Sequence, residues 1–153
     1  MDVSKHIIYG AIFSIVVYFL FPFIGILEAI IIFLSSVLVD VDIYIYYVFK
    51  KKSLNLFKAY KWAINKKEKF IKMPYKDRKN FYFGQRLLHG IEIIIILFLA
   101  GIFASKWIFL IFVGFSFHLL LDLIDQVTYY ERVDKFSLIH DLKKFKHLKR
   151  LEE

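Results

Sequence analysis

The sequence has 153 residues, room for one domain of ordinary size, and 59% of them are hydrophobic and 20% aromatic. A single small core cannot bury so much apolar surface, so the composition excludes an ordinary soluble domain and predicts an integral membrane protein. The formal net charge of +8 would also suit a nucleic-acid-binding protein, but the basic residues lie between and after the apolar segments, as membrane topology requires.

Four apolar segments predict an all-α fold, an integral membrane bundle of about four transmembrane helices. The segments cover residues 7–21, 26–49, 87–104 and 107–127. A basic loop, residues 50–86, separates the second segment from the third, and residues 128–153 form a charged tail. Residues 1–153 are therefore expected to form a single membrane domain. Because no small-residue cleavage pattern follows the first segment, we interpret it as a retained helix and not as a signal peptide.

The basic loop carries a pattern of its own. Leu54, Phe57, Tyr60 and Ile64 recur at helical spacing among lysines, which is typical of an amphipathic helix lying at the lipid interface. The alternative is a solvated connector whose lysines only set the topology. Nucleic-acid binding is a weaker interpretation, since nothing else in the chain supports it.

The distribution of basic residues predicts the orientation. Of the 22 Lys and Arg residues, 13 lie in residues 50–86, seven lie in the tail, and Lys5 precedes the first segment. Only Lys106 falls in a loop on the opposite side of the membrane. Because short loops rich in Lys and Arg stay in the cytoplasm, we expect a multi-pass protein of the cell (plasma or inner) membrane with both termini cytoplasmic.

Several ionisable residues fall inside or next to the apolar segments, where charge is costly and usually faces the bundle interior or a wet cavity. In this topology they lie toward the cytoplasmic ends of all four segments: His6, Asp40, Asp42, Arg86, His89, Glu92, His118, Asp122 and Asp125. The common depth predicts that these side chains meet.

The spacing of these residues points to metal binding. His118 and Asp122 are four residues apart, so they share one helical face and can bind one ion together; His89 and Glu92, three apart, can do likewise. Asp40 and Asp42 are two residues apart and would point about 200° from each other on an ideal helix. Both can face one site only if the helix unwinds there, or one of them serves a second metal or a neighbouring helix.

The donor types limit the choice of ion. There is no cysteine, so a metal site must use His and carboxylates, a set that suits zinc first and also manganese or iron. Several carboxylates could hold two ions bridged by one of them. The alternative is structural: Asp122 or Asp125 pairs with Arg86 or His89 and holds the bundle together.

Four motifs in order resemble those of the YdjM-like family of predicted membrane-bound metal-dependent hydrolases. They are Lys5-His6 followed by Gly10, Ser35-Ser36-Val37-Leu38-Val39-Asp40-Val41-Asp42, Arg86-Leu87-Leu88-His89, and Gly114-Phe115-Ser116-Phe117-His118-Leu119-Leu120-Leu121-Asp122. The sequence departs from the family where Ile43 replaces a His and Gly84 replaces another. Glu92 is the candidate to replace the missing ligand. The resemblance implies a membrane-bound hydrolase that requires a metal.

Two hypotheses follow. In the first, the chain is a membrane-embedded metal-dependent hydrolase acting on a phosphoester or another anionic amphiphile, with a metal-bound water as nucleophile. Arg86 would clamp an anionic group and Glu92 would assist, while the metal ligands would be His6, Asp40, Asp42, His89, His118 and Asp122. In the second, the chain is a non-enzymatic metal or proton carrier or a structural subunit. Four helices are few for a carrier, which would therefore act as a homo-oligomer.

Overall fold

The computed structural model describes residues 3–78, 80–82, 88–130, 137–145 and 149–150, and Arg86 lies outside them. The described part is almost entirely helical, which confirms the all-α class. Its helices are α1 (Val3–Leu20), α2 (Ile26–Leu38), α3 (Val41–Lys51), α4 (Leu56–Lys72), α5 (Tyr75–Arg78), α6 (Ile91–Phe103), α7 (Lys106–Asp125), the π-helix η1 (Gln126–Tyr130) and α8 (Leu138–Phe145). Two short strands, β1 (Phe81–Tyr82) and β2 (Lys149–Arg150), pair in parallel.

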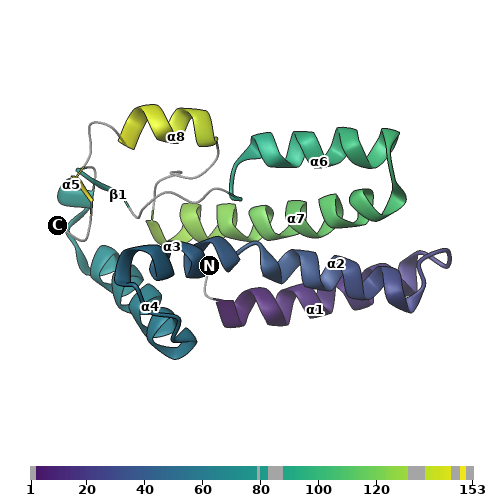
Figure 1. Ribbon diagram of the computed structural model, residues 1–153, viewed down its shortest axis with the longest axis horizontal. Coiled ribbons are helices and arrows are strands. Elements are labelled where there is room, and N and C mark those ends of the chain that lie inside the picture. Colours follow the sequence, from purple (N-terminus) through teal and green to yellow (C-terminus); the bar gives the residue numbers. More distant parts are fainter. Residues whose placement is uncertain (1–2, 79, 83–87, 131–136, 146–148, 151–153) are drawn as a thin grey trace.

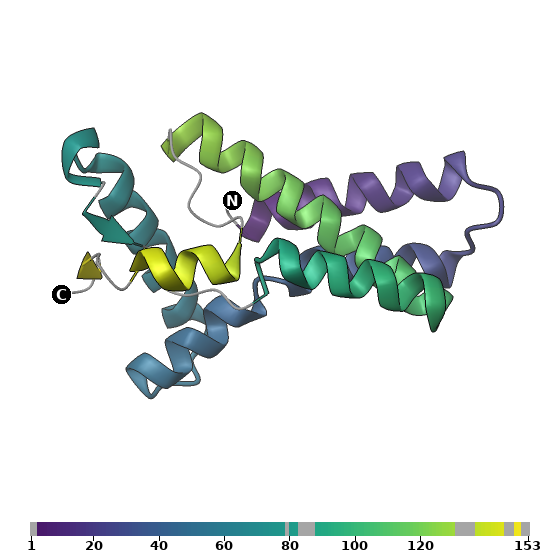
Figure 2. The same ribbon diagram turned by 90° about the horizontal axis from the view of Figure 1, so that it is seen from above.

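Two helical hairpins form the bundle. The first consists of α1 and α2, and the second of α6 and α7, with the connections of both hairpins at the same end (Figure 1). Helix α7 is central, because it packs against α2, α6 and α1. Helices α3 and α4 extend as an arm from the opposite end, which we call the arm end (Figures 1 and 2).

Small residues allow α2 to approach both α7 and α1 closely. A Cβ atom added at Gly114 of α7 would meet Ser35 Oγ and the carbonyl oxygen of Ile32 on α2. One added at Gly10 of α1 would meet Ser36 Oγ. Close approach of this kind is how helices associate where no hydrophobic effect drives them together. The Ser35-Ser36 segment of α2 therefore lies tightly between α1 and α7.

The apolar surface of the bundle is largely exposed. Phe19 on α1, Leu27 on α2 and Phe103 on α6 are 76%, 58% and 84% exposed, whereas many of the buried residues are polar or charged. One helix, Lys106–Thr128, is long and apolar enough to cross a membrane by length and composition, while Ser4–Leu20 and Ile91–Phe103 are shorter apolar helices.

The second predicted helix, residues 26–49, is not continuous. It turns at Val39 and Asp40, so α2 ends at Leu38 and α3 leaves in a different direction (Figure 2). At the turn, Asp40 N donates to Val37 O at 3.4 Å and Ile43 N donates to Asp40 O at 3.0 Å, the i→i−3 pattern of a tighter helix. The turn allows Asp40 and Asp42 to face the same histidine, which an unbroken helix would prevent.

The third predicted helix, residues 87–104, begins later than expected. Gly90 is extended and serves as the N-cap, so α6 starts at Ile91 and His89 precedes the helix. The backbone N–H of Leu88 donates to Asp42 Oδ2, at 3.1 Å.

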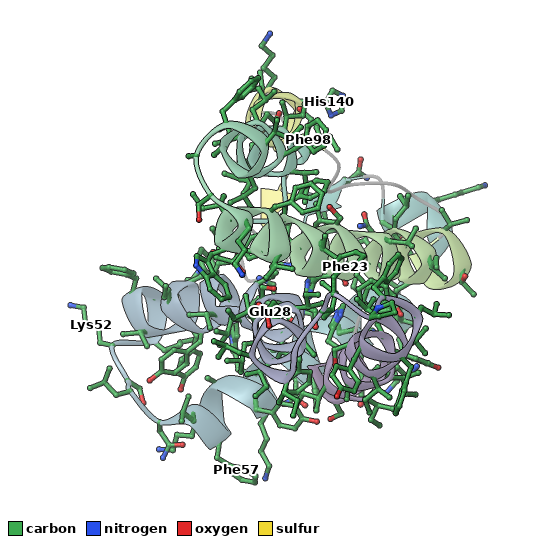
Figure 3. The ribbon with its side chains drawn as sticks, turned by 90° about the vertical axis from the view of Figure 1, so that its right-hand side faces the viewer. Phe23, Glu28, Lys52, Phe57, Phe98 and His140 are labelled. Carbon is green, nitrogen blue, oxygen red and sulfur yellow. The ribbon has the colours of Figure 1, made fainter. Side chains whose placement is uncertain are left out.

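The predicted loop and tail contain helices. The amphipathic segment is α4, which is capped by Asn55 through a 2.9 Å bond from Lys58 N and packs Trp62 against Tyr47 of α3. Phe57 is 64% exposed and points away from the bundle (Figure 3). Its contact with lipid stays a prediction. The tail contains α8, which lies beside the start of α6 (Figures 1 and 2).

Candidate metal centre

A cluster of buried His and Asp side chains lies at the arm end of the bundle. It brings together His6 from α1, Asp40 from the turn after α2, Asp42 from α3, His89 from the segment before α6, and His118 and Asp122 from α7. All are at most 8% exposed. The structure thus places every residue predicted as a metal ligand in one cluster, although their positions within it differ.

His118 is oriented by a backbone carbonyl. Its Nδ1 lies 2.7 Å from Ser36 O, and because a carbonyl can only accept, Nδ1 carries the proton and donates it. This assignment leaves the lone pair on Nε2, which faces the cluster 3.3 Å from His89 Nε2. The close packing of Ser36 between α1 and α7 is what brings its carbonyl to this position.

His89 is oriented by a carboxylate. Its Nδ1 donates to Asp42 Oδ2 at 3.1 Å, so its Nε2 also presents a lone pair to the cluster. A carboxylate behind a histidine in this way fixes the tautomer and raises the basicity of a metal ligand. Asp42 was predicted to be a ligand; in the structure its carboxylate contacts Nδ1 of His89, and its binding of an ion stays a prediction.

Three donor atoms have the separations of a metal site. His89 Nε2 lies 3.3 Å from His118 Nε2 and 3.4 Å from Asp122 Oδ2, and the third distance, His118 Nε2 to Asp122 Oδ2, is 3.9 Å. Bonds of about 2.0–2.1 Å at a tetrahedral angle separate zinc ligands by about 3.3 Å. The three residues form a group that could hold an ion.

Asp40 lies beside the same pair of imidazoles. Its Oδ1 is 3.4 Å from His89 Nε2 and 3.8 Å from His118 Nε2. Its other oxygen, Oδ2, is 3.9 Å from His6 Nε2. Asp40 is therefore within reach of more than one imidazole through different oxygen atoms.

His6 occupies the far side of the cluster. Its Nε2 is 3.2 Å from Asp122 Oδ1, and its ring stacks on that of His118 with centroids 3.9 Å apart. Unlike the other two histidines, His6 has no hydrogen-bond partner for Nδ1 among the residues that the structure describes. His6, Asp40 and His118 form a second group that could hold an ion.

Of the two residues predicted to be catalytic, the structure describes Glu92, which does not join the cluster. Arg86 lies outside the described residues. Glu92 instead accepts hydrogen bonds from Ser137 Oγ, from Leu138 N at 3.0 Å and from Ile139 N at 3.3 Å. A carboxylate at these amides satisfies the free N–H groups that begin α8, so Glu92 acts as its cap.

Asp125, on the next turn of α7, has a separate partner. Lys67 Nζ of α4 donates to Asp125 Oδ2 at 3.2 Å, and the carboxylate is almost fully buried. The ion pair ties the arm to the end of α7. Pairing of this kind was predicted for Asp125 with Arg86 or His89; the partner that the structure gives it is a lysine of the loop.

Sequence reasoning missed the contribution of the backbone. Ser36 O and Leu88 N hold His118 and Asp42 in place, yet neither group depends on its side chain. The available signal was the presence of small residues in two motifs, Ser35-Ser36 in one and Gly114 in another, which indicates close helix packing.

Comparison of the chain with protein-family models, curated proteins and solved structures gave no match. The site is therefore interpreted from its own residues.

Proposed function

We propose that this chain is a membrane-embedded, metal-dependent hydrolase whose divalent ion is held by His89, His118 and Asp122 near the cytoplasmic face. The observation that carries the proposal is the spacing of their three donor atoms, 3.3, 3.4 and 3.9 Å apart. Catalytic zinc sites use three protein ligands and keep one position for water or substrate, so in this proposal Asp40, whose Oδ1 lies 3.4 Å from His89 Nε2, is a neighbour of the ion and not its fourth ligand.

Exposed apolar side chains on α1, α2, α6 and α7 support a multi-pass arrangement in which both hairpins cross the bilayer. Helix α7, with 20 residues, is about 30 Å long and matches the hydrocarbon core. Helix α2, with 13 residues, is about 20 Å long, so the turn at Asp40 and the start of α3 complete that crossing. The basic residues of the arm favour a cytoplasmic position for the arm and for both termini.

The residues around the proposed ion suit hydrolysis. A bound divalent ion supplies Lewis acidity and lowers the pKa of a water in the open position. Asp40 Oδ1 lies 3.4 Å from His89 Nε2, beside the proposed ligands, and would accept a proton from such a water. His118 and His89 keep their lone pairs toward the ion because Ser36 O and Asp42 hold their Nδ1 protons.

An anionic amphiphile, such as a lipid phosphoester, is the substrate class that fits the surroundings. The arm carries exposed Lys58, Lys61 and Lys69 on α4, at the same end of the bundle as the cluster. Basic residues at a membrane surface attract anionic headgroups by about 1 kcal/mol each. Arg86, which lies outside the described residues, remains our candidate for contacting the anionic group.

The alternative function is a non-enzymatic carrier or structural subunit. The observation that favours it is that the cluster also makes direct contacts without an ion, such as His6 Nε2 with Asp122 Oδ1 at 3.2 Å. A buried network of this kind can hold helices together or pass protons. Zinc, manganese or iron content distinguishes it from a metal-dependent enzyme.

The test begins with elemental analysis of the protein purified in detergent. Wild type is expected to contain at least one Zn, Mn or Fe per chain, and His118→Ala to lose it, while His140→Ala on the exposed side of α8 retains it. Circular dichroism of both variants checks that the helices are intact. Absence of metal from wild type, or its full retention in a folded His118→Ala variant, overturns the proposal.

The second step is an activity assay with phosphoester, phospholipid and amide substrates. Hydrolysis of a phosphoester or phospholipid is expected, and a chelator should stop it until metal is restored. A protein that binds metal stoichiometrically but cleaves none of these substrates is a carrier or a structural protein, and the hydrolase proposal is then wrong.

A further inference from the structure

We propose that the cluster binds two divalent ions, the second held by His6 Nε2, Asp122 Oδ1 and Asp40 Oδ2. The inference rests on the proposed function, because Asp122 serves the first ion through its other oxygen. It adds a second binding site and assigns His6 a role that the first ion does not give it.

The two oxygen atoms of Asp122 face different histidines. Oδ2 lies 3.4 Å from His89 Nε2, whereas Oδ1 lies 3.2 Å from His6 Nε2. A carboxylate that presents one oxygen to each of two sets of imidazole ligands has the arrangement of a bridge between two ions.

Asp40 divides its oxygen atoms in the same way. Its Oδ1 faces His89 Nε2 at 3.4 Å, and its Oδ2 faces His6 Nε2 at 3.9 Å. Asp40 and Asp122 come from different segments of the chain, and each has one carboxylate oxygen near His89 and the other near His6. Repetition on independent elements indicates a site with two metal positions.

The second ion should bind more weakly than the first. His118 and His89 each donate Nδ1–H to an oxygen, which holds the ligand tautomer. His6 Nδ1 has no such partner in the described part of the chain. Since an oxygen behind a ligand histidine changes metal affinity by about 10- to 100-fold, we expect the two ions to bind in separate steps of about that ratio.

The experiment is a titration of metal-free full-length protein in detergent with Mn²⁺. Wild type is expected to bind two equivalents, with an electron paramagnetic resonance signal that shows exchange coupling between them. His6→Ala and His6→Gln are expected to bind one equivalent and to give an uncoupled signal; the glutamine variant retains a side chain that can still donate to Asp122. His140→Ala, an exposed histidine, is the matched control and should behave as wild type.

Each outcome has a separate meaning. Saturation of wild type at one equivalent, or two coupled equivalents in either folded His6 variant, overturns the second site and leaves the proposed hydrolase standing. No binding at all by folded wild type overturns both. Loss of the coupled signal with retention of the stronger equivalent in both His6 variants supports the second site.

Discussion

The two ends of the bundle hold ionisable residues in opposite ways. At the end with the connections, Lys106 Nζ pairs with Glu28 Oε1 at 3.3 Å, and the lysine side chain is 68% exposed. At the arm end, the His and Asp side chains are almost fully buried. Solvent screens the first pair, so it needs no further partner. The buried carboxylates need compensation by a cation, which is why the chemistry is expected at the arm end alone.

The largest effect is expected from Gly114→Val, which separates the helices that form the buried end. The new side chain would meet the backbone of Ile32 and Ser36 on α2, so α7 and α2 can no longer pack as closely as they do in the wild type. We expect the free energy of unfolding to fall by about 3 kcal/mol, the upper part of the usual range for overpacking, with loss of bound metal. Denaturant unfolding in detergent, monitored by circular dichroism, measures the free energy of unfolding.

Ser116→Val is the matched control for this substitution, since it places the same side chain on the same helix at a half-buried position. Its effect should stay within about 1 kcal/mol. Intrinsic helix propensity favours Val over Gly, so a loss at position 114 cannot come from the helix itself. Equal effects at positions 114 and 116 would contradict the close approach of α2 and α7.

A smaller effect is expected from Asp42→Asn, which removes the charge behind His89 and leaves the proposed ligands in place. The amide oxygen can still accept from Leu88 N or His89 Nδ1, but it no longer raises the basicity of the imidazole. Metal affinity should fall by about 10- to 100-fold without a change in the number of ions bound.

Isothermal titration with metal measures the affinity, and Asp77→Asn on α5 is the control, because that carboxylate is exposed. A loss of one whole equivalent in Asp42→Asn would mean that Asp42 is itself a ligand, as the sequence predicted. An unchanged affinity would mean that the contact with His89 has no role in binding.

The sequence predicted the helical class and the residues of the cluster because both depend on patterns along the chain. Apolar segments define helices, and tracing them back and forth brings His6, Asp40, His89, His118 and Asp122 to one depth. The sequence predicted a break at Asp40 only on the condition that Asp40 and Asp42 share one site, since neither Gly nor Pro stands there to break the helix. It follows from the tertiary contacts of the Asp40 carboxylate with two histidines.

The role of Glu92 could not be predicted for a related reason. Its spacing of three from His89 implies a shared helical face only if both residues are helical. His89 precedes the extended Gly90, so the rule does not apply, and Glu92 is instead placed where it caps α8. Backbone groups such as Ser36 O leave no trace in the sequence, because every residue has them.

The smallest effect is expected from Lys106→Cys, which breaks the ion pair at the end with the connections. Exposed ion pairs contribute about 0–1 kcal/mol, so the free energy of unfolding should change by no more than this and metal binding should be unchanged.

Because the chain has no native cysteine, the same variant also tests the proposed topology. A membrane-impermeant thiol reagent should label Cys at position 106 in intact cells, whereas His140→Cys on α8 should react only after permeabilisation. Labelling of position 140 alone would reverse the orientation, and labelling of both in intact cells would contradict a crossing between them.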